Sequence, residues 1–470
     1  MNPIEDQARP APAGTPAKPG RRRRRFGLSL RALMGVVLLF GGGLGWLAYR
    51  ARVQRQAVAA IEAAGGHVTY RWLFGGPEGS SPTTSVRWKW LVDAVGPDYL
   101  GTVVAVIGDM FGEKGTDDAL MARIGRLGGL ERLLISGQGV GTVTDAGMAH
   151  LRNLSRLEDL WIQDCLAVTD AGLDHLRGLT RLRELELSQT GIDGPGLKNL
   201  AGMTRLEDLK INRALEDDAL AHLAGLTTLK RLHLSGVGLT DAGLAHLRGL
   251  THLRALEIEV PIIPGFPEIE VPTDLKLPEF VRDPSRITDA GLAYFGGMAH
   301  LEELSLAGTG VASLRPLAGL ARLWSLDLTG TPIDDAGLAP VAGFPELAKL
   351  ILAQTQVGDA GLAHLGGLTN LTELDLSGTR VTDAGLARLP RLSSLDLSST
   401  AITDAGLPAL LAAAAPLDRL NLSGTAITDA GLGLLAARGG FKELYLSGTK
   451  ATAAGLDALR IAIPGVEVLP

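Results

Sequence analysis

The chain has 470 residues, a formal net charge of −6 at pH 7 and a single cysteine. Its length exceeds that of one ordinary compact domain, and its acidic balance argues against nucleic acid as a partner of the whole chain. One cysteine excludes an internal disulfide framework and a multi-cysteine zinc site. Glycine accounts for 61 residues, roughly twice its average usage, which indicates a turn that recurs along the chain.

The N-terminal segment predicts a membrane anchor. Residues 1–25 form a tail rich in proline and charge that ends in the block Arg21–Arg25, and we expect it to be disordered and cytoplasmic. Residues 26–49 are mostly apolar and, at about 1.5 Å per residue, approach the hydrocarbon thickness as one transmembrane helix. The basic block places the repeats outside the cytoplasm, in the periplasm or extracellular space. A cleaved signal peptide and a buried core helix are the alternatives.

Residues 50–98 differ from the sequence after them and predict a small N-terminal capping region. We expect a helix over 53–64 ended by two glycines, a strand over 67–74 and a second helix over 86–95. The cap would cover the exposed core of the first repeat, whose strand is expected at 102–107. Three tryptophans in this region leave an aromatic ligand site as the alternative.

One sequence unit recurs over residues 99–470. It begins with Leu-x-x-Leu-x-Leu, as in Leu182–Leu187 and Leu371–Leu376, and alternate leucines predict a short strand with those side chains inward. A Gly-Thr turn follows, and then Thr-Asp-Ala-Gly-Leu, as in Ile402–Leu407. In this motif Thr is expected to N-cap a short helix, while Asp supplies negative charge at its start. The central leucine recurs at Leu133, Leu160, Leu185, Leu209, Leu232, Leu256, Leu304, Leu326, Leu350, Leu374, Leu395, Leu420 and Leu444.

One step between central leucines, from Leu256 to Leu304, is twice as long as the others. It marks an insertion over 259–286 that is rich in proline, so regular helix is not expected there. The insertion leaves just after a strand and should project beside the exposed strand surface. A binding role, with Phe266 as a contact, and disorder are the two interpretations.

The repeated unit resembles the leucine-rich-repeat family, specifically the bacterial Thr-Asp-Ala-Gly-Leu type, which is similar to the cysteine-containing repeats of F-box proteins. The resemblance covers roughly residues 100–470. It implies an α/β leucine-rich-repeat solenoid that is curved, with parallel strands on the concave face and helices on the convex face. No F-box-like segment is evident in the sequence, so the adaptor function of F-box proteins is not implied.

The cysteine and the recurring histidines do not predict catalysis. Cys165 occupies the turn position that Thr190, Thr331, Thr379 and Thr425 hold in other repeats, so we expect it to face inward. Five histidines occupy one helix position in different repeats, and no carboxylate or serine recurs with them. We therefore expect no enzyme activity, no cofactor and no metal site. The five are His150, His175, His222, His246 and His364.

Exposed positions on the predicted strands are the better candidates for binding. Trp161 is a large aromatic side chain of the kind that anchors interfaces, or it covers the junction with the cap. Asp327, Asp375 and Asp396 form an acidic row that would favour a basic partner or a cation, or is merely a solvated face. The predicted partner-binding residues are Trp161, Glu186, Lys210, His233, Asp327, Asp375, Asp396, Tyr445 and Phe266.

These patterns favour a membrane-anchored module that binds a protein through its concave surface outside the cytoplasm. The alternative is a structural or envelope scaffold with no discrete partner, and an enzyme is the third hypothesis. Neither nucleic acid nor a small-molecule substrate is indicated.

Overall fold

The structure is a computed structural model. It describes residues 30–71, 96–108, 115–137, 142–235, 238–260, 286–413, 417–464 and 466–469. The chain divides into two units, Met1–Arg52 and Val53–Pro470, and the second unit holds the repeats.

A single long helix, α1 (Leu30–Ala63), replaces the two helices that were expected around residue 50. It is continuous because residues 50–63 contain neither proline nor glycine and are mostly good helix formers. Among the described residues no helix is both long enough and apolar enough to cross a membrane, so the predicted transmembrane helix lacks support here. Residues 26–29 of that predicted helix lie outside the described part.

The last turns of α1 belong to the second unit and pack against its first strands. Ala57 and Ile61 belong to the same buried cluster as Val103 and Val106. Strand β1 (His67–Tyr70) pairs antiparallel with β2 (Val103–Ile107), so the strand expected at 67–74 is shorter than predicted. The helix expected at 86–95 and the three tryptophans lie outside the described residues.

The described strands form one sheet of sixteen, in which each strand lies beside its neighbours in sequence. All pairs after β1–β2 are parallel, and the thirteen predicted central leucines face one another across consecutive strands, as Leu160 faces Leu185. The predicted parallel sheet is therefore confirmed. The remaining strands are β3 (Arg132–Ser136), β4 (Asp159–Gln163), β5 (Glu184–Ser188), β6 (Asp208–Ala214), β7 (Arg231–Ser235), β8 (Ala255–Glu259), β9 (Glu303–Ser305), β10 (Ser325–Asp327), β11 (Lys349–Ile351), β12 (Glu373–Asp375), β13 (Ser394–Asp396), β14 (Arg419–Asn421), β15 (Glu443–Tyr445) and β16 (Glu467–Leu469).

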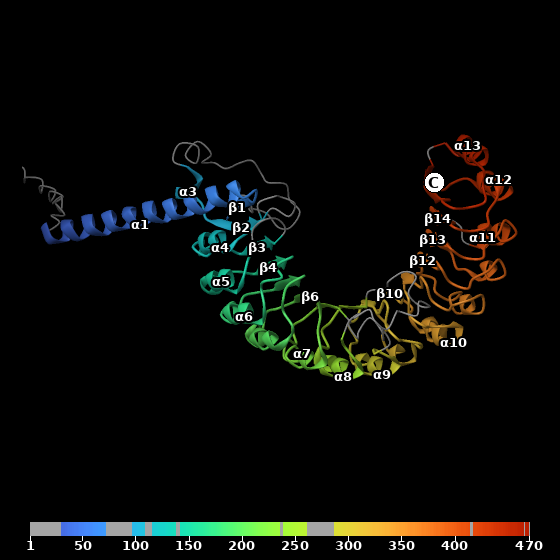
Figure 1. Cartoon of the computed structure of the whole chain (residues 1–470), viewed down its shortest axis with the longest axis horizontal. Coiled ribbons are helices and arrows are strands. Elements are labelled where there is room, and N and C mark those ends of the chain that lie inside the picture. The colour runs from blue at the N-terminus through green and yellow to red at the C-terminus, as the bar shows by residue number, and fades with distance from the viewer. Residues whose placement is uncertain are drawn as a thin grey trace, which may run out of the picture. The chain divides into compact units, whose positions relative to one another are not determined.

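Within the second unit the strands line the inner side and the helices the outer side, with a leucine core between them (Figure 1). Five of the described outer segments are a single α-helical turn followed by a 3₁₀ turn, and the others are α-helical or 3₁₀ alone. The α-helices are α3 (Pro97–Leu100), α4 (Asp118–Ile124), α5 (Asp145–Met148), α6 (Asp170–Leu173), α7 (Asp217–Ala221), α8 (Asp241–Leu244), α9 (Asp289–Leu292), α10 (Asp335–Leu338), α11 (Leu407–Ala413), α12 (Asp429–Arg438) and α13 (Ala453–Ala462). The 3₁₀ helices are η2 (Ala149–Asn153), η3 (Asp174–Leu176), η4 (Pro195–Gly202), η5 (Ala245–Gly249), η7 (Ala293–Phe295), η8 (Arg315–Leu317), η9 (Ala339–Gly343), η10 (Gly361–His364) and η11 (Leu386–Arg388).

The doubled step in the leucine spacing is an insertion, as predicted. Leu256 on β8 lies directly opposite Leu304 on β9, so the register continues without a gap. The amide of Val260 donates to the carbonyl of Ala307 at 2.8 Å, which holds the two repeats together where the insertion leaves. Residues 261–285, including Phe266, lie outside the described part of the chain.

The Thr-Asp pair of the repeated motif joins one repeat to the next at eight junctions of the described chain. Thr169 caps its own helix α6 as predicted, because its hydroxyl accepts the amide N–H of Ala171 at 3.3 Å. Its amide and hydroxyl both donate to the carboxylate of Asp145 in the preceding repeat, at 2.8 and 2.7 Å. The motif aspartate therefore binds the following repeat as well as starting its own helix. The same two hydrogen bonds join Asp118 to Thr144, Asp217 to Thr240, Asp241 to Thr288, Asp359 to Thr382, Asp383 to Thr403, Asp404 to Thr428 and Asp429 to Thr452.

The glycine of Thr-Asp-Ala-Gly-Leu makes room for that carboxylate. A Cβ atom at Gly431 would lie 2.2 Å from Oδ1 of Asp404, well inside van der Waals contact. Gly433, two residues along the same helix α12, has no atom within 4 Å of its Cβ position. One motif thus combines a helix cap, a link to the next repeat and a space for the link from the previous repeat.

We predict opposite effects of alanine at these two glycines. Gly431→Ala should lower the free energy of unfolding by about 1–3 kcal/mol, because the Asp404 carboxylate must move away from Thr428. Gly433→Ala is the matched control and should be neutral or stabilising by up to about 1 kcal/mol, through helix propensity alone. Urea unfolding followed by circular dichroism measures both. Equal effects of the two substitutions would contradict this role of the motif glycine.

Candidate functional site

Outward side chains of the parallel strands form one surface, which we call the strand face. On β4, Leu160 and Ile162 are fully buried, whereas Asp159, Trp161 and Gln163 are half-buried and point outward. Because the strands are in register, the residues after the central leucines form a row across the sheet. The predicted residues Trp161, Glu186, Lys210 and His233 occupy this row on β4, β5, β6 and β7, and Asp327, Asp375, Asp396 and Tyr445 occupy it on β10, β12, β13 and β15.

Trp161 is held in a fixed position on this face. Its indole Nε1 donates a 2.7 Å hydrogen bond to Oε1 of Glu184 on the neighbouring strand. The ring is half-buried and forms part of the row rather than of the leucine core. A rigid aromatic surface loses little side-chain entropy when a partner packs on it.

The other predicted residues on the N-terminal half of the face are each paired with a residue on a neighbouring strand. Lys210 Nζ lies 3.3 Å from Oε1 of Glu186, which is only 15% exposed. The ring of His233 forms a hydrogen bond to Glu257 on β8, and this bond lowers the pKa of the Glu257 carboxyl. Cross-strand pairing of this kind leaves little uncompensated charge over β5–β8.

On the C-terminal half, the row is acidic and lacks such pairing. Asp375 and Asp396 lie directly opposite each other on β12 and β13, and Ile351 on β11 separates Asp375 from Asp327. Burial raises the pKa of the Asp375 carboxyl, and the charges of Asp396 and Asp327 raise it further, against hydrogen bonds from Ser377 that lower it. The row thus holds three carboxylates and no basic side chain between β10 and β13.

These aspartates also have a local structural role that the sequence reasoning missed. Oδ1 of Asp375 accepts the amide N–H of Ser377 at 2.8 Å and so supports the turn that follows the strand. Asp396 does the same for Ser398, at 2.8 Å, and its second oxygen accepts from Asn421. The sequence Leu-Asp-Leu-Ser could have predicted this role, because an aspartate side chain favours a hydrogen bond to the amide N–H two residues later.

Tyr445 is apart from the acidic residues. Its hydroxyl donates a 3.0 Å hydrogen bond to Glu443 on the same strand β15, and Asn421 on β14 separates it from Asp396. Glu443 is also paired with Arg419 at 3.0 Å. Tyr445 therefore extends the row as a half-buried aromatic beyond the acidic stretch.

Cys165 is buried in the turn slot that the repeat register predicted. Its Sγ lies 3.2 Å from the carbonyl oxygen of Gln163, and burial raises the pKa of the thiol to about 12. Thr331 and Thr425, in the same slot, are buried and donate to backbone carbonyls. A thiol of such high pKa is a poor nucleophile. Among the described residues, no three His, Cys, Asp or Glu side chains gather as a metal ion would require.

Comparison with known families identifies the repeat. A family model described as Leucine Rich repeat matches residues 179–201, 367–389, 390–411 and 415–436. The same strand register and the same Asp–Thr links continue through strands that the family model does not match. No curated protein matches the chain.

Several solved structures are similar to this chain. An internalin from Listeria monocytogenes is 20% identical with a TM-score of 0.45, and the match covers 78% of this chain and 86% of that one. A leucine-rich-repeat protein from Leptospira interrogans is 17% identical with a TM-score of 0.42, covering 74% and 91%. The ectodomain of a plant receptor kinase from Arabidopsis thaliana is 16% identical with a TM-score of 0.45, covering 82% and 47%. The fold assignment rests on the chain's own strand register.

The acidic row makes a prediction about stability and pH. Because the pKa of folded Asp375 lies above its unfolded value, the ionised carboxylate destabilises the fold at neutral pH, and the cost disappears as the pH falls through that pKa. Asp375→Asn keeps an oxygen for Ser377 and should raise the free energy of unfolding at pH 7 by up to about 1 kcal/mol. The gain should vanish below about pH 4, the ordinary aspartate range.

Asp375→Ala is the control for this prediction, because it removes the charge and the turn acceptor together. It should lower stability at pH 7 relative to Asp375→Asn. If the asparagine variant is destabilised as much as the alanine variant at neutral pH, the carboxylate charge is not a cost to the fold.

Proposed function

We propose that the chain is a protein-binding module whose strand face contacts the partner. The observation that carries this proposal is the uncompensated acidic row of Asp327, Asp375 and Asp396 beside a half of the face whose charges are paired. The ionised carboxylate of Asp375 costs stability in the free protein, and a complementary partner that neutralises it would relieve this cost. The favoured partner is therefore a protein segment rich in lysine and arginine.

Trp161 supplies the second part of the proposed interface. Its hydrogen-bonded ring on the N-terminal half of the strand face would contact a partner at a low cost in side-chain entropy. Glu186, Lys210 and His233 would form a polar rim around it. Tyr445 would serve similarly beyond the acidic row. The Thr-Asp-Ala-Gly-Leu motif supports assignment to the bacterial type of repeat, and the module would have no enzyme activity.

A tethered location outside the cytoplasm forms a further part of the proposal. The basic block Arg21–Arg25 precedes the apolar segment, and Leu38, Leu39 and Phe40 on α1 are 72%, 78% and 71% exposed. Apolar side chains exposed this far are stabilised by a lipid environment. In bacterial spheroplasts that express the chain, added protease should digest the repeats and spare the N-terminal tail. Protection of the repeats would overturn this topology.

The strand-face proposal predicts a loss of binding to basic peptides. In a fluorescence-anisotropy titration, Asp327→Asn, Asp375→Asn and Asp396→Asn together should weaken binding of a Lys/Arg-rich peptide by about tenfold or more, and more strongly at low salt. Trp161→Ala should weaken capture of a folded partner without changing the thermal unfolding midpoint.

A matched control removes the same number of charges elsewhere. Asp218→Asn, Glu346→Gln and Asp457→Asn together neutralise three exposed acids outside the strand face and should leave the affinity almost unchanged. Equal losses from the two triple variants would mean that bulk charge, and not the strand face, attracts the peptide. No binding by the wild type would favour the alternative of a scaffold without a discrete partner.

A further inference from the structure

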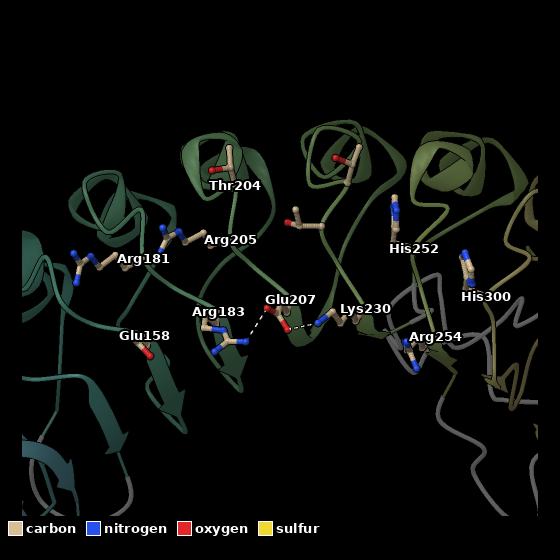
Figure 2. A pocket seen from close by; sticks show the side chains of 12 residues that line it. Glu158, Arg181, Arg183, Thr204, Arg205, Glu207, Lys230, His252, Arg254 and His300 are labelled. Carbon is tan, nitrogen blue, oxygen red and sulfur yellow. Dashed lines mark hydrogen bonds and ion pairs between the residues drawn. The ribbon is translucent and has the colours of Figure 1, made fainter. Parts of the chain in front are cut away.

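A second candidate surface lies on the flank of the repeats, where each turn enters its strand (Figure 2). We call it the flank groove. It is a hollow of about 690 Å³ that extends from Glu158, just before β4, to His300, shortly before β9. It is formed by the residues that precede the strands, and so it is separate from the row that defines the strand face.

The charge of the flank groove is opposite to that of the chain. Five arginine and lysine side chains line it against two glutamates, and one of the five, Arg254, is paired with Glu302 outside the lining at 3.1 Å. This leaves an excess of two positive charges with the histidines neutral. The whole chain has a formal net charge of −6. Positive charge is therefore concentrated in the groove against an acidic background, which is the pattern that steers anionic ligands to one place.

One row of the groove consists of Arg183, Glu207 and Lys230, which form ion pairs with one another. The Glu207 carboxylate lies between Arg183, at 2.9 Å, and Lys230, at 2.6 Å, as the dashed lines of Figure 2 show. These two hydrogen bonds lower the pKa of Glu207, so it remains ionised. Two cations share one anion, which leaves this triad with one net positive charge.

A second row lies closer to the helices and is not paired. Arg181 and Arg205 occupy the same position in consecutive repeats, and neither forms an ion pair or hydrogen bond with the described residues. Neighbouring parallel strands are about 4.8 Å apart, so repetition places the two backbones close together. Adjacent like charges without a counter-ion are unfavourable. An anion bound between them would remove this repulsion.

Two histidines continue this row at the other end of the groove. His252 and His300 are 48 positions apart in the sequence, yet their rings are stacked with centroids 6.3 Å apart and planes at 13°. They meet because β8 and β9 are neighbours across the insertion. The same position is Arg322 in the next repeat, whose Nη1 lies 3.3 Å from Nδ1 of His300, and Glu346 in the repeat after that. The residues that line the hollow lie between Glu158 and His300, so the groove is confined to these consecutive repeats.

We propose that the flank groove binds an acidic peptide segment, whose carboxylates pair with Arg181 and Arg205. Guanidinium groups match carboxylates through two parallel hydrogen bonds, and Thr204 and Thr227 in the same lining offer hydroxyls to peptide groups. The interaction differs from that proposed for the strand face, where the partner is basic and the protein acidic.

The two glutamates in the lining favour a peptide over a uniform polyanion. Glu158 and Glu207 interrupt the positive row, so a nucleic acid or sulfated glycan would bring phosphate or sulfate groups against them. A peptide can place a neutral or basic residue at these points. Tryptophan, tyrosine and phenylalanine, the usual platforms for stacked bases, are not among the groove's lining residues.

The test is a titration of the full chain with a fluorescent oligoglutamate peptide. Arg181→Ala combined with Arg205→Ala should weaken binding by about tenfold or more, because each substitution removes a charge-assisted pair. Arg248→Ala combined with Arg391→Ala removes the same charge from exposed positions outside the groove and should change the affinity by less than about twofold. Equal losses from the two pairs would overturn the proposal.

A charge reversal and a competitor complete the experiment. Arg181→Glu with Arg205→Glu should abolish oligoglutamate binding. Made in a chain that already carries Asp327→Asn, Asp375→Asn and Asp396→Asn, the same reversal should create binding to oligolysine, which misfolding could not do. Tighter binding of heparin or single-stranded DNA than of the peptide would also overturn the proposal. The strand-face triple variant should bind oligoglutamate at least as well as the wild type, so failure of one proposal is distinguishable from failure of the other.

Discussion

The hydrogen bonds from each Thr amide and hydroxyl to the preceding repeat's aspartate are the interaction on which the rest of this structure depends. Asp145 and Thr169, at 2.8 and 2.7 Å, are representative. A leucine core alone is non-directional and would tolerate sliding of one repeat against the next. The carboxylate fixes both the start of a helix and its position relative to its neighbour. The glycine of the same motif is what allows the carboxylate to lie there.

Because the repeats are evenly spaced, side chains at one repeat position form a continuous surface. Because the strands are in register, a residue type chosen at one position of several repeats becomes a row with a defined charge. The aspartates of β10, β12 and β13 make one acidic row, and the arginines before β5 and β6 make a basic one on the flank. The two surfaces have opposite charge, so one scaffold can present them to different partners without competition.

The sequence predicted what is repeated and what is local. Thirteen central leucines, the Thr cap and the burial of Cys165 could be predicted because each copy supports the others. The partner of the motif aspartate could not, since it is 24 residues away and depends on how two repeats stack. The flank groove was overlooked although Arg181, Arg205, His252 and His300 hold one repeat position, because only the stacked turns make that position a hollow. Strand β16 was overlooked because Val468 replaces the leucine.

Hydrogen exchange measured by mass spectrometry tests the central claim, that the aspartate of one repeat orders the next. In Asp145→Ala, the amides around Thr169 and the start of α6 should exchange faster by about an order of magnitude or more, since the loss of two hydrogen bonds weakens the local structure. Distant repeats such as those around Thr428 should exchange as in the wild type. Unchanged protection around Thr169 would contradict the claim and assign the register to the leucine core alone.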